Sequence, residues 1–370
     1  MSQRIVVKGR AIGPDEQIFI TAEIGASHMG DYQAARELVI GAKKAGCDGA
    51  DMFLASPEDF NHCGAPDWIE AWREQSLTPE QWHDLFNLAE EIGIILYVTP
   101  LDIPSIKLGL KLGSPMFNIN SDVVNDLRML ELIGEAGIPV SMHDIGITLS
   151  EIEAAIQTLK ASGCSGIILL HSTREGKMDE LGYSASNLRV MDTYRAAFSH
   201  KNVQVGCVEH TDSDFLIYGV AAREAVMISK HIITRHSEGA PDDSISVELR
   251  HLQEMVHNVR MVQSALGKGT NCILPSKAPG SEIASVRAKI LVAGRNIPAG
   301  KMIDKDDVVA KRKWVPGGMH PWKMRELYGS QAKQNIANDE VLSINMFTNF
   351  VYADYKYPHI DIFENDSLRK

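Results

Sequence analysis

The sequence lacks several features that would point to a particular environment. Its five cysteines among 370 residues form no CxxC pair, and so sparse and odd a set argues against a disulfide framework or a zinc–cysteine site. No apolar run approaches the roughly 18 residues of a membrane span, and the amino terminus, MSQRIVVKGR, lacks the apolar core of a signal peptide. The net charge of −11 offers no basic footprint for nucleic acid or anionic lipid. These absences predict a cytoplasmic protein that binds neither nucleic acid nor membrane.

The chain does contain a regular alternation of short apolar strands and amphipathic helices. The first clear unit runs from Thr21 to Phe53: a strand ending in Glu23-Ile24-Gly25, a helix closed by Gly46, and a second strand. We count eight such strand–helix repeats, with helices expected at 186–198, 213–222 and 245–265, among others. Residues 54–77 look like a long loop. Eight parallel repeats predict a (β/α)8 TIM barrel over residues 1–267. An open doubly wound sheet is the alternative, but no GxGxxG follows its first strand.

The carboxyl-terminal third has a different character. Residues 268–286 are crowded with Gly, Pro, Ser and Lys and show no periodicity, which is typical of a linker. Residues 287–349 alternate strand-like pieces with turns and predict a compact, mostly β domain. We expect the tail, 350–370, to pack partly and to fray at its end.

Polar residues gather where the predicted strands end, and in such barrels the active site lies at the carboxyl ends of the strands. A single histidine there is more often a hydrogen-bonded structural residue, but several histidines and acids converging on one rim favour a site. These residues are Glu23, His28, Asp51, Thr99, Asn118, Asn120, Ser121, His143, Asp144, His171, Arg174, Glu209, His210, Lys230 and His231.

Two of these histidines suggest a metal. His210 and His231 end adjacent strands, so their imidazoles could share one divalent ion, with water or carboxylate oxygens completing an octahedron. Glu209, His143, Asp144 or Asp51 could lie within reach. The alternative is that both imidazoles only hydrogen-bond to loops.

Glu23 and His28 are the candidate catalytic residues. Glu23 could serve as general acid or base if partial burial raises its pKa, and His28 follows it in the same loop. The alternative for Glu23 is a salt bridge to a loop cation.

These residues stand in recognisable motifs. The segments EIGASHMG, AxxLVxxAKKAGCDGAD, YVTPLD, FNINS, LLHST, EHT and KHI resemble the sialic acid (N-acetylneuraminate) synthase family. The segment RAKILVAGRNIPAGKMIDKDDVVAKR, followed by LYG, is similar to that family's antifreeze-like (SAF) domain. The resemblance covers nearly the whole chain, roughly residues 15–347, with both domains in the right order.

The resemblance implies an activity. Members condense phosphoenolpyruvate with an N-acetylated sugar such as N-acetylmannosamine, giving a nine-carbon keto acid and phosphate. They use a divalent ion, commonly manganese, and form homodimers in which each SAF domain covers the partner's barrel. By position, the family's functional residues correspond to the catalytic Glu23, the metal ligands His210 and His231, the phosphoenolpyruvate contacts Thr99 and Ser121, the sugar-holding Asp242, and the SAF arginine Arg312.

Six positions depart from the pattern that the resemblance implies. Asp51 and Asn118 stand where the family has lysines, and His143 replaces a phosphate-contacting serine. Arg174 and Ser27 replace asparagines, and Val208 replaces a serine. Exchanging a lysine for a carboxylate changes the local charge by two units, and each charge–charge interaction at about 4 Å amounts to about 4 kcal/mol at an effective dielectric of 20. We therefore expect a rebuilt phosphoenolpyruvate pocket beside an intact glutamate, metal pair and sugar-side acid.

Three functions remain open. The first is a metal-dependent enzyme of nonulosonate or amino-sugar metabolism whose chemistry is altered to a retro-aldol, epimerisation, dehydration or condensation with another donor. The second is the standard phosphoenolpyruvate-dependent synthase. The third is a non-catalytic protein that binds a sugar or metabolite on the same scaffold.

Overall fold

The structure is a computed structural model that describes residues 4–173, 182–213, 215–236, 242–267, 289–312, 315 and 317–349. The chain divides into two compact units, Met1–Lys268 and Gly269–Lys370. The predicted linker 268–286, the tail 350–370 and Arg174 lie outside the described residues.

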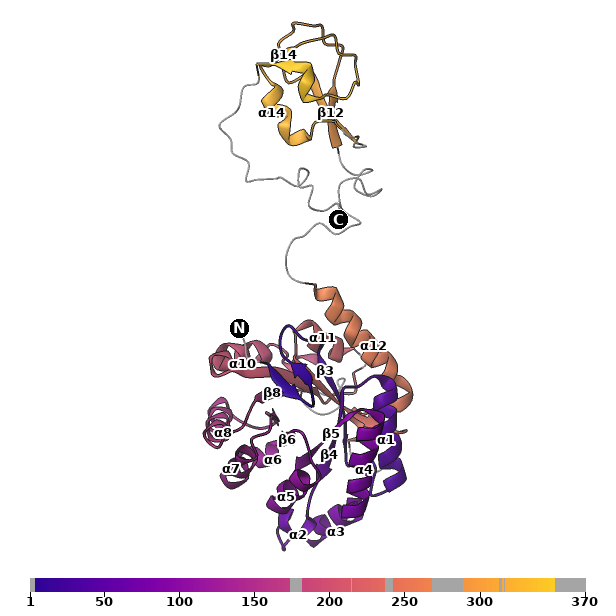
Figure 1. The fold of residues 1–370 in the computed structure, drawn as a ribbon, viewed down its shortest axis with the longest axis vertical. Helices are drawn as coiled ribbons and strands as arrows, with labels where there is room; N and C mark the ends of the chain where they lie inside the picture. The colour runs from indigo at the N-terminus through magenta and orange to yellow at the C-terminus, as the bar shows by residue number, and fades with distance from the viewer. Residues whose placement is uncertain are drawn as a thin grey trace. The chain divides into compact units, whose positions relative to one another are not determined.

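The first unit is a closed barrel of eight parallel strands, which confirms the predicted fold (Figure 1). Closure is complete because the last barrel strand pairs with both its predecessor and the first. Nearly every strand residue is buried, as expected for strands with the bore on one face and helices on the other. The strands are β3 (Phe19–Gly25), β4 (Gly49–Leu54), β5 (Ile95–Pro100), β6 (Phe117–Ile119), β7 (Val140–His143), β8 (Ile167–Ser172), β9 (Val203–Glu209) and β10 (Met227–Ile233).

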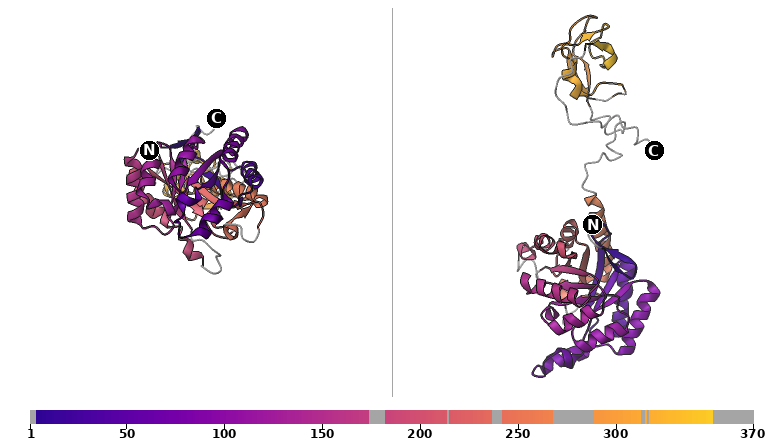
Figure 2. Two further views of the ribbon diagram at one scale, coloured as in Figure 1. Left: turned by 90° about the horizontal axis from the view of Figure 1, so that it is seen from below. Right: turned by 60° about the vertical axis from the view of Figure 1, so that its left-hand side comes forward.

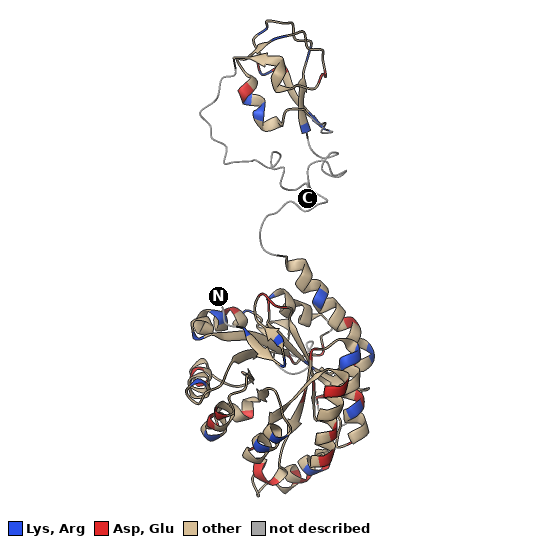
Figure 3. Cartoon of the chain, viewed as in Figure 1, with Lys and Arg blue, Asp and Glu red and all other residues tan. Residues whose placement is uncertain are grey.

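Helices surround the strands (Figures 1 and 2). Their ends follow local sequence: Thr78 and Thr148 form capping boxes with Gln81 and Glu151. Lysines, arginines and acids are interspersed along the helices (Figure 3), and the buried residues of the helices are mostly apolar. The helices of this layer are α1 (Tyr32–Ala45), α4 (Pro79–Ile92), α5 (Ile103–Lys111), α6 (Ser121–Val124), α7 (Leu127–Glu135), α8 (Leu149–Ala161), α10 (Val190–Phe198), α11 (Leu216–Ala222) and α12 (Leu249–Leu266).

The prediction of a loop at 54–77 is wrong, because this segment contains α2 (Pro57–Phe60) and α3 (Pro66–Gln75). Both helices begin at a proline, and proline at the first helical position favours a helix rather than breaking it. The two helices contact each other through aromatic side chains: the ring centroids of Phe60 on α2 and Trp72 on α3 are 5.2 Å apart.

Three helices begin later than predicted, at Val190, Leu216 and Leu249. A separate 3-10 turn, η1 (Tyr183–Ser186), precedes α10. Before α12, the strand β11 (Val247–Glu248) pairs with the end of β10, so the chain is extended where helical periodicity was expected.

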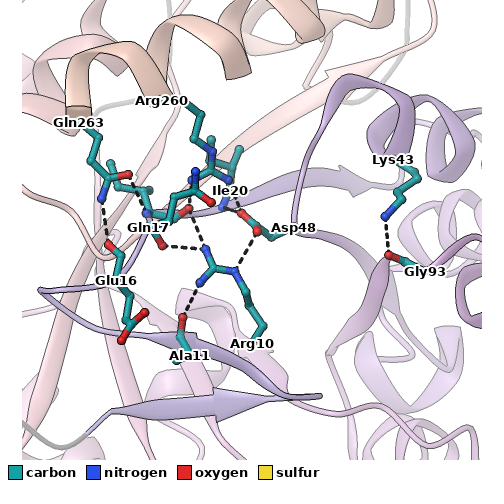
Figure 4. Close-up of polar contacts among 11 residues, drawn as sticks. Arg10, Ala11, Glu16, Gln17, Ile20, Lys43, Asp48, Gly93, Arg260 and Gln263 are labelled. Carbon is teal, nitrogen blue, oxygen red and sulfur yellow. Dashed lines mark hydrogen bonds and ion pairs between the residues drawn. The ribbon is translucent and has the colours of Figure 1, made fainter. Parts of the chain in front are cut away.

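An amino-terminal hairpin, β1 (Ile5–Val7) and β2 (Arg10–Ile12), was not anticipated. Its apolar side chains form one buried cluster with residues at the amino ends of the barrel strands, among them Phe19, Met116 and Met227. Ion pairs then fix it: the Arg10 and Arg260 guanidiniums lie 3.0 and 2.6 Å from the two oxygens of Asp48 (Figure 4). The hairpin thus fills the amino end of the barrel.

The second unit is small and mostly β, as predicted. β12 (Lys289–Ala293) pairs with β13 (Val308–Arg312), and β14 (Gln331–Ala332) with β15 (Phe347–Thr348). One apolar core joins these pairs and the short helix α14 (Met324–Leu327). None of the helices in the described part of the chain has the length and apolar character needed to span a bilayer.

Candidate active site at the carboxyl end of the barrel

Four predicted residues meet inside the carboxyl end of the barrel. Glu23 on β3 is the register partner of His231 on β10, His143 is the last residue of β7, and His210 directly follows β9. We call Glu23, His143, His210 and His231 the Glu23 cluster. All four side chains are buried.

The cluster is compact. One ligand atom each of Glu23, His143 and His210 lie within 4.8 Å of one another. His231 Nε2 is 3.6 Å from Glu23 Oε1, and its ring stacks on that of His210 with centroids 5.0 Å apart. The sequence suggested the pair His210 and His231 with His143 or one of three carboxylates within reach, and the fold places His143 and Glu23 beside the pair.

The charges within the cluster are set by burial and proximity. Burial by itself would raise the pKa of Glu23, but His231, His143 and the Ser229 hydroxyl outweigh it and lower that pKa. Burial lowers the pKa of His143, and lowers that of His210 to well below its ordinary value. Glu23 is therefore an ionised base at neutral pH, in contrast to the raised pKa that the sequence suggested.

A divalent cation fits these residues. Within the described residues, the buried Glu23 carboxylate has as polar partners the Ser229 hydroxyl, 2.8 Å away, and the neighbouring imidazoles. An ionised carboxylate that is fully buried is costly unless positive charge accompanies it. Neutral imidazoles and a carboxylate are also the donors that divalent transition ions prefer.

Three of the departures from the family pattern form one hydrogen-bonded network beside the Glu23 cluster. Thr99 Oγ1 donates to the Asp51 carboxyl, at 2.8 and 3.0 Å from its two oxygens. Asn118 Nδ2 lies 3.0 Å from Asp51 Oδ2 and 3.1 Å from His143 Nε2. Ser141 Oγ donates to Asn118 Oδ1 at 2.7 Å. Asn118 thus contacts both Asp51 and His143, and we call these three residues the Asn118 network.

Asp51 differs from Glu23 in its charge. Burial and then the negative charge of Glu23 raise the pKa of Asp51 well above its ordinary value. Two neighbouring carboxyls whose pKa values are pushed apart share their roles as base and acid. The raised pKa favours the neutral form of Asp51, so exchanging lysine for it changes the local charge by less than the two units of a full carboxylate. The two units assumed from sequence overstate the change.

Other polar strand ends belong to the outer side of the barrel. His171 Nδ1 lies 3.0 Å from Asp144 Oδ2, and His171 Nε2 lies 2.9 Å from the Ser186 carbonyl oxygen. Both ring nitrogens therefore have hydrogen-bond partners, as in a structural histidine. Lys230 forms a buried ion pair with Glu209 and donates to the Thr211 carbonyl at 2.6 Å. Neither Asp144 nor Glu209, considered from sequence as a metal neighbour, is in the Glu23 cluster.

His28 and Ser121 have local partners. His28 Nδ1 accepts the N–H of Gly30 at 3.1 Å, and burial lowers the pKa of His28 to about 4, so the ring is neutral at pH 7. Ser121 opens α6 and its hydroxyl donates to Asn120 Oδ1 at 2.9 Å. Their assigned roles in catalysis and in binding substrate remain predictions.

Asp242 and Arg312 were assigned to the sugar. Asp242 Oδ2 lies 3.8 Å from His231 Nδ1, which has no hydrogen-bond partner in the described structure, so the acid stands at the edge of the Glu23 cluster. Arg312 is an exposed residue of β13 in the second unit.

Two site residues were missed from sequence. Ser229 binds Glu23, and Ser141 binds Asn118. Each stands two residues before a predicted histidine, His231 or His143, on the same strand. Side chains two apart share a face, so this spacing was the available signal.

The barrel, the buried acid–imidazole cluster at its carboxyl end and the small β domain together define a (β/α)8-barrel enzyme with an appended domain. Residues 55–271 match the NeuB family and residues 288–348 match the SAF domain. The chain belongs to the NeuB family, and it is an enzyme of the synthase type. This confirms the resemblance to sialic acid synthases.

Relatives align along nearly their whole length. An uncharacterized protein of Methanocaldococcus jannaschii is 30% identical over 345 residues, covering 92% of this chain and 97% of that protein. The N-acetylneuraminate-9-phosphate synthase of Mus musculus is 26% identical, with coverages of 90% and 94%. The N,N'-diacetyllegionaminic acid synthase of Legionella pneumophila is also 26% identical, with coverages of 88% and 93%.

Solved structures support the fold. A putative spore coat polysaccharide biosynthesis protein E of Chromobacterium violaceum superposes with a TM-score of 0.72 at 19% identity, covering 89% of this chain and 99% of that one. An N-acetylneuraminic acid synthetase of Leptospira borgpetersenii gives a TM-score of 0.69 at 23% identity, with coverages of 75% and 94%.

Proposed function

We propose that this protein is a metal-dependent, sialic-acid-synthase-like enzyme of nonulosonate or amino-sugar metabolism with a rebuilt phosphoenolpyruvate pocket. One observation carries the proposal. The Asn118 network occupies the positions at which the resemblance implies two lysines and a phosphate-contacting serine, and its members bind one another. The network's hydrogen-bond partners in the described structure include no lysine or arginine.

The charge balance supports a donor other than phosphoenolpyruvate. That substrate brings nearly three negative charges, and the Asn118 network contains no lysine or arginine to balance them. A missing cation about 4 Å from a phosphate forfeits about 4 kcal/mol at an effective dielectric of 20, about three orders of magnitude in affinity. A retro-aldol, an epimerisation, a dehydration or a condensation with another donor would each avoid this cost.

The residues of the cluster have distinct tasks in such chemistry. A divalent ion such as manganese, held by His210 and His231, would polarise a substrate carbonyl oxygen. The Glu23 carboxylate, ionised and oriented by Ser229, takes a proton from the carbon next to that carbonyl or returns it. Asp242, at the cluster's edge, accepts hydrogen bonds from hydroxyl groups of the sugar or keto acid. The closed amino end and the buried walls keep bulk water from the reacting carbon.

The standard synthase reaction is the second candidate. It is supported by the names of curated relatives, among them N-acetylneuraminate-9-phosphate and N,N'-diacetyllegionaminic acid synthases. A protonated Asp51 would also not repel phosphoenolpyruvate as a carboxylate would. In this case a cation from another part of the chain has to neutralise the phosphate, and Arg174 is the sequence's candidate.

Phosphate release separates the two. The full-length protein is incubated with phosphoenolpyruvate, N-acetylmannosamine and manganese, and phosphate and the nine-carbon keto acid are measured. We expect no release. Rapid release that is lost in Glu23→Gln would overturn the rebuilt pocket and establish the second candidate.

Altered chemistry is tested without phosphoenolpyruvate. N-acetylated sugars and their keto-acid aldol products are incubated in deuterium oxide, and deuterium incorporation is followed by mass spectrometry. We expect incorporation that requires Glu23 and survives in His171→Gln, a control at a neighbouring strand end. Sugar binding with neither incorporation nor turnover would instead establish the non-catalytic function.

A further inference from the structure

The Glu23 cluster contains one imidazole more than a two-histidine metal site requires. We propose that His143 is a third imidazole ligand, oriented by Asn118, so that one ion is bound by Glu23, His143, His210 and His231. The inference rests on the proposed function for the presence of an ion at this site. The sequence placed His143 both at a substrate-contact position and within reach of the metal, and this inference selects the second role.

The distances favour His143 as a ligand. Atoms bound to one transition ion at about 2.1 Å lie roughly 3 to 4 Å from each other. The ligand atoms of Glu23, His143 and His210 already lie within 4.8 Å of one another. Small side-chain rotations therefore suffice to close them on an ion. His231 joins through its contact of 3.6 Å with Glu23.

Asn118 supplies the outer contact that a ligating histidine requires. Such a histidine binds the ion through one ring nitrogen and donates the other N–H to an oxygen. Asn118 Nδ2 carries two hydrogens but faces three groups, Asp51 Oδ2, Thr99 Oγ1 and His143 Nε2, at 3.0, 3.0 and 3.1 Å.

An asparagine amide fits equally well with its oxygen and nitrogen exchanged, and the hydrogen-bond network decides between the two arrangements. In the exchanged arrangement the amide oxygen accepts the Nε2–H of His143 and the amide nitrogen donates to Ser141. A hydrogen on the Asp51 carboxyl or on the Thr99 hydroxyl can then point to the same oxygen, and the amide nitrogen no longer faces more groups than it has hydrogens. His143 Nδ1 keeps its lone pair for the ion.

The arrangement explains why the departures occur together. Asp51 contacts Asn118, Asn118 orients His143, and His143 faces the ion. The three residues therefore form one chain of contacts that leads to the ion. Three imidazoles and a carboxylate suit borderline ions such as zinc, iron, cobalt or nickel rather than magnesium. The geometry therefore assigns these positions to metal binding instead of phosphate binding.

Cobalt(II) binding to the full-length protein tests the proposal, since its visible absorption reports the ligand set without any substrate. The variants are His143→Gln and Asn118→Leu, and His171→Gln is the matched control for losing a buried strand-end histidine. Circular dichroism and thermal unfolding check that each variant is folded. We expect His143→Gln to weaken cobalt binding at least tenfold and to change the absorption bands, and Asn118→Leu to weaken it about 10- to 100-fold.

A measurement on the unaltered protein guards against misfolded variants. With zinc bound, 15N spectra of labelled histidines should show three metal-bound imidazoles rather than two. Two metal-bound imidazoles, or cobalt affinity and bands that are the same in His143→Gln as in His171→Gln, would overturn the assignment.

The outcomes distinguish this inference from the proposed function. Sugar-dependent deuterium exchange together with an unaffected His143→Gln spectrum refutes the ligand and leaves the function. Lost metal binding in His143→Gln without any reaction on sugars refutes the function and leaves the ligand. A full-length protein that binds neither cobalt nor zinc refutes the ligand assignment as well.

Discussion

At the residue scale, neighbours on one strand serve opposite faces of the barrel. His231 lies in the bore against Glu23, while Lys230 before it pairs with Glu209 on the outer side. The alternation of a strand enforces this division. Adjacent polar residues in the sequence, such as Lys230-His231 and Glu209-His210, therefore have unrelated tasks.

The first prediction concerns the ion pair of Lys230 and Glu209. Lys230→Met should destabilise the barrel by about 3 to 5 kcal/mol, because it leaves the Glu209 charge buried and unpaired. The double variant Lys230→Met/Glu209→Gln should recover much of this loss. Urea unfolding measures both. Lys201→Met, which breaks a surface pair with Glu153, is the control and should cost little; equal losses at the two sites would contradict the prediction.

His28 gives a prediction about pH. Its pKa in the folded state is about 4, against an ordinary value of 6.5, so the unfolded chain takes up a proton at a higher pH than the folded chain does. The contribution of His28 to the free energy of unfolding should therefore be fully present above pH 6.5. It should be lost as the pH decreases to about 4, which lowers the free energy of unfolding by up to about 3 kcal/mol.

In His28→Asn this part of the pH dependence should disappear. Urea unfolding of the barrel at a series of pH values measures the difference between the two proteins. Parallel curves for the variant and the unaltered protein would show that the ring titrates normally in the folded state.

At the scale of elements, the segment between β4 and α4, which contains α2 and α3, packs closely against a glycine of the barrel. Gly30 has φ +78°, and a Cβ there would lie 2.1 Å from the carbonyl oxygen of Glu74 on α3. The loop that carries His28 and the helix α3 are therefore packed backbone to backbone. The sequence offered Gly30 only as a loop residue, because its partner lies more than 40 residues away.

Gly30→Ala should loosen this contact. We expect it to destabilise the barrel by about 3 kcal/mol or more, since both the backbone conformation and the space exclude a side chain. Gly113→Ala is the matched control: it has the same φ of +78° but nothing within 4 Å of the added Cβ, and should cost about 1 kcal/mol. Thermal unfolding measures both, and limited proteolysis should cut α3 faster in the first. Equal effects would mean that the contact with Glu74 is not tight.

At the scale of the whole molecule, the open question is how the two units cooperate. The resemblance implies a homodimer in which the SAF domain serves the partner's barrel, with Arg312 as the contributed arginine. This stays a prediction, and it can be tested by complementation between two inactive chains.

Arg312→Ala and Glu23→Gln should each abolish turnover, and co-expression of the two should restore it in part. A mixed dimer then has one barrel with Glu23 intact and Arg312 supplied by its partner. Random pairing makes about half of the dimers mixed, and each mixed dimer has one complete barrel of two. We therefore expect about a quarter of full activity in the co-expressed mixture and about half in mixed dimers purified through two different tags. No restoration would mean that Arg312 acts within its own chain or not at all.

The sequence by itself determined the barrel and the small β domain. Periodicity, helix caps and buried strands are local properties, and eight repeats leave few alternatives to closure. It also identified Glu23, His143, His210 and His231, because the carboxyl ends of parallel strands necessarily meet. Local signals failed where a residue's role depends on its partner: prolines that begin α2 and α3 resembled loop residues, and the amino-terminal hairpin needed the open end of the barrel to pack against.

Only the tertiary structure decided how those residues are grouped. Burial of Asp51 beside Glu23 sets which of the two carboxyls is ionised, and neither fact is written in the sequence around either residue. The contact of Asn118 with both Asp51 and His143 joins three strands. Sequence showed three unrelated replacements, and the fold made them one hydrogen-bonded chain leading to the Glu23 cluster. The reason is physical: distance and dielectric environment fix charge and coordination, and both are properties of the packed chain.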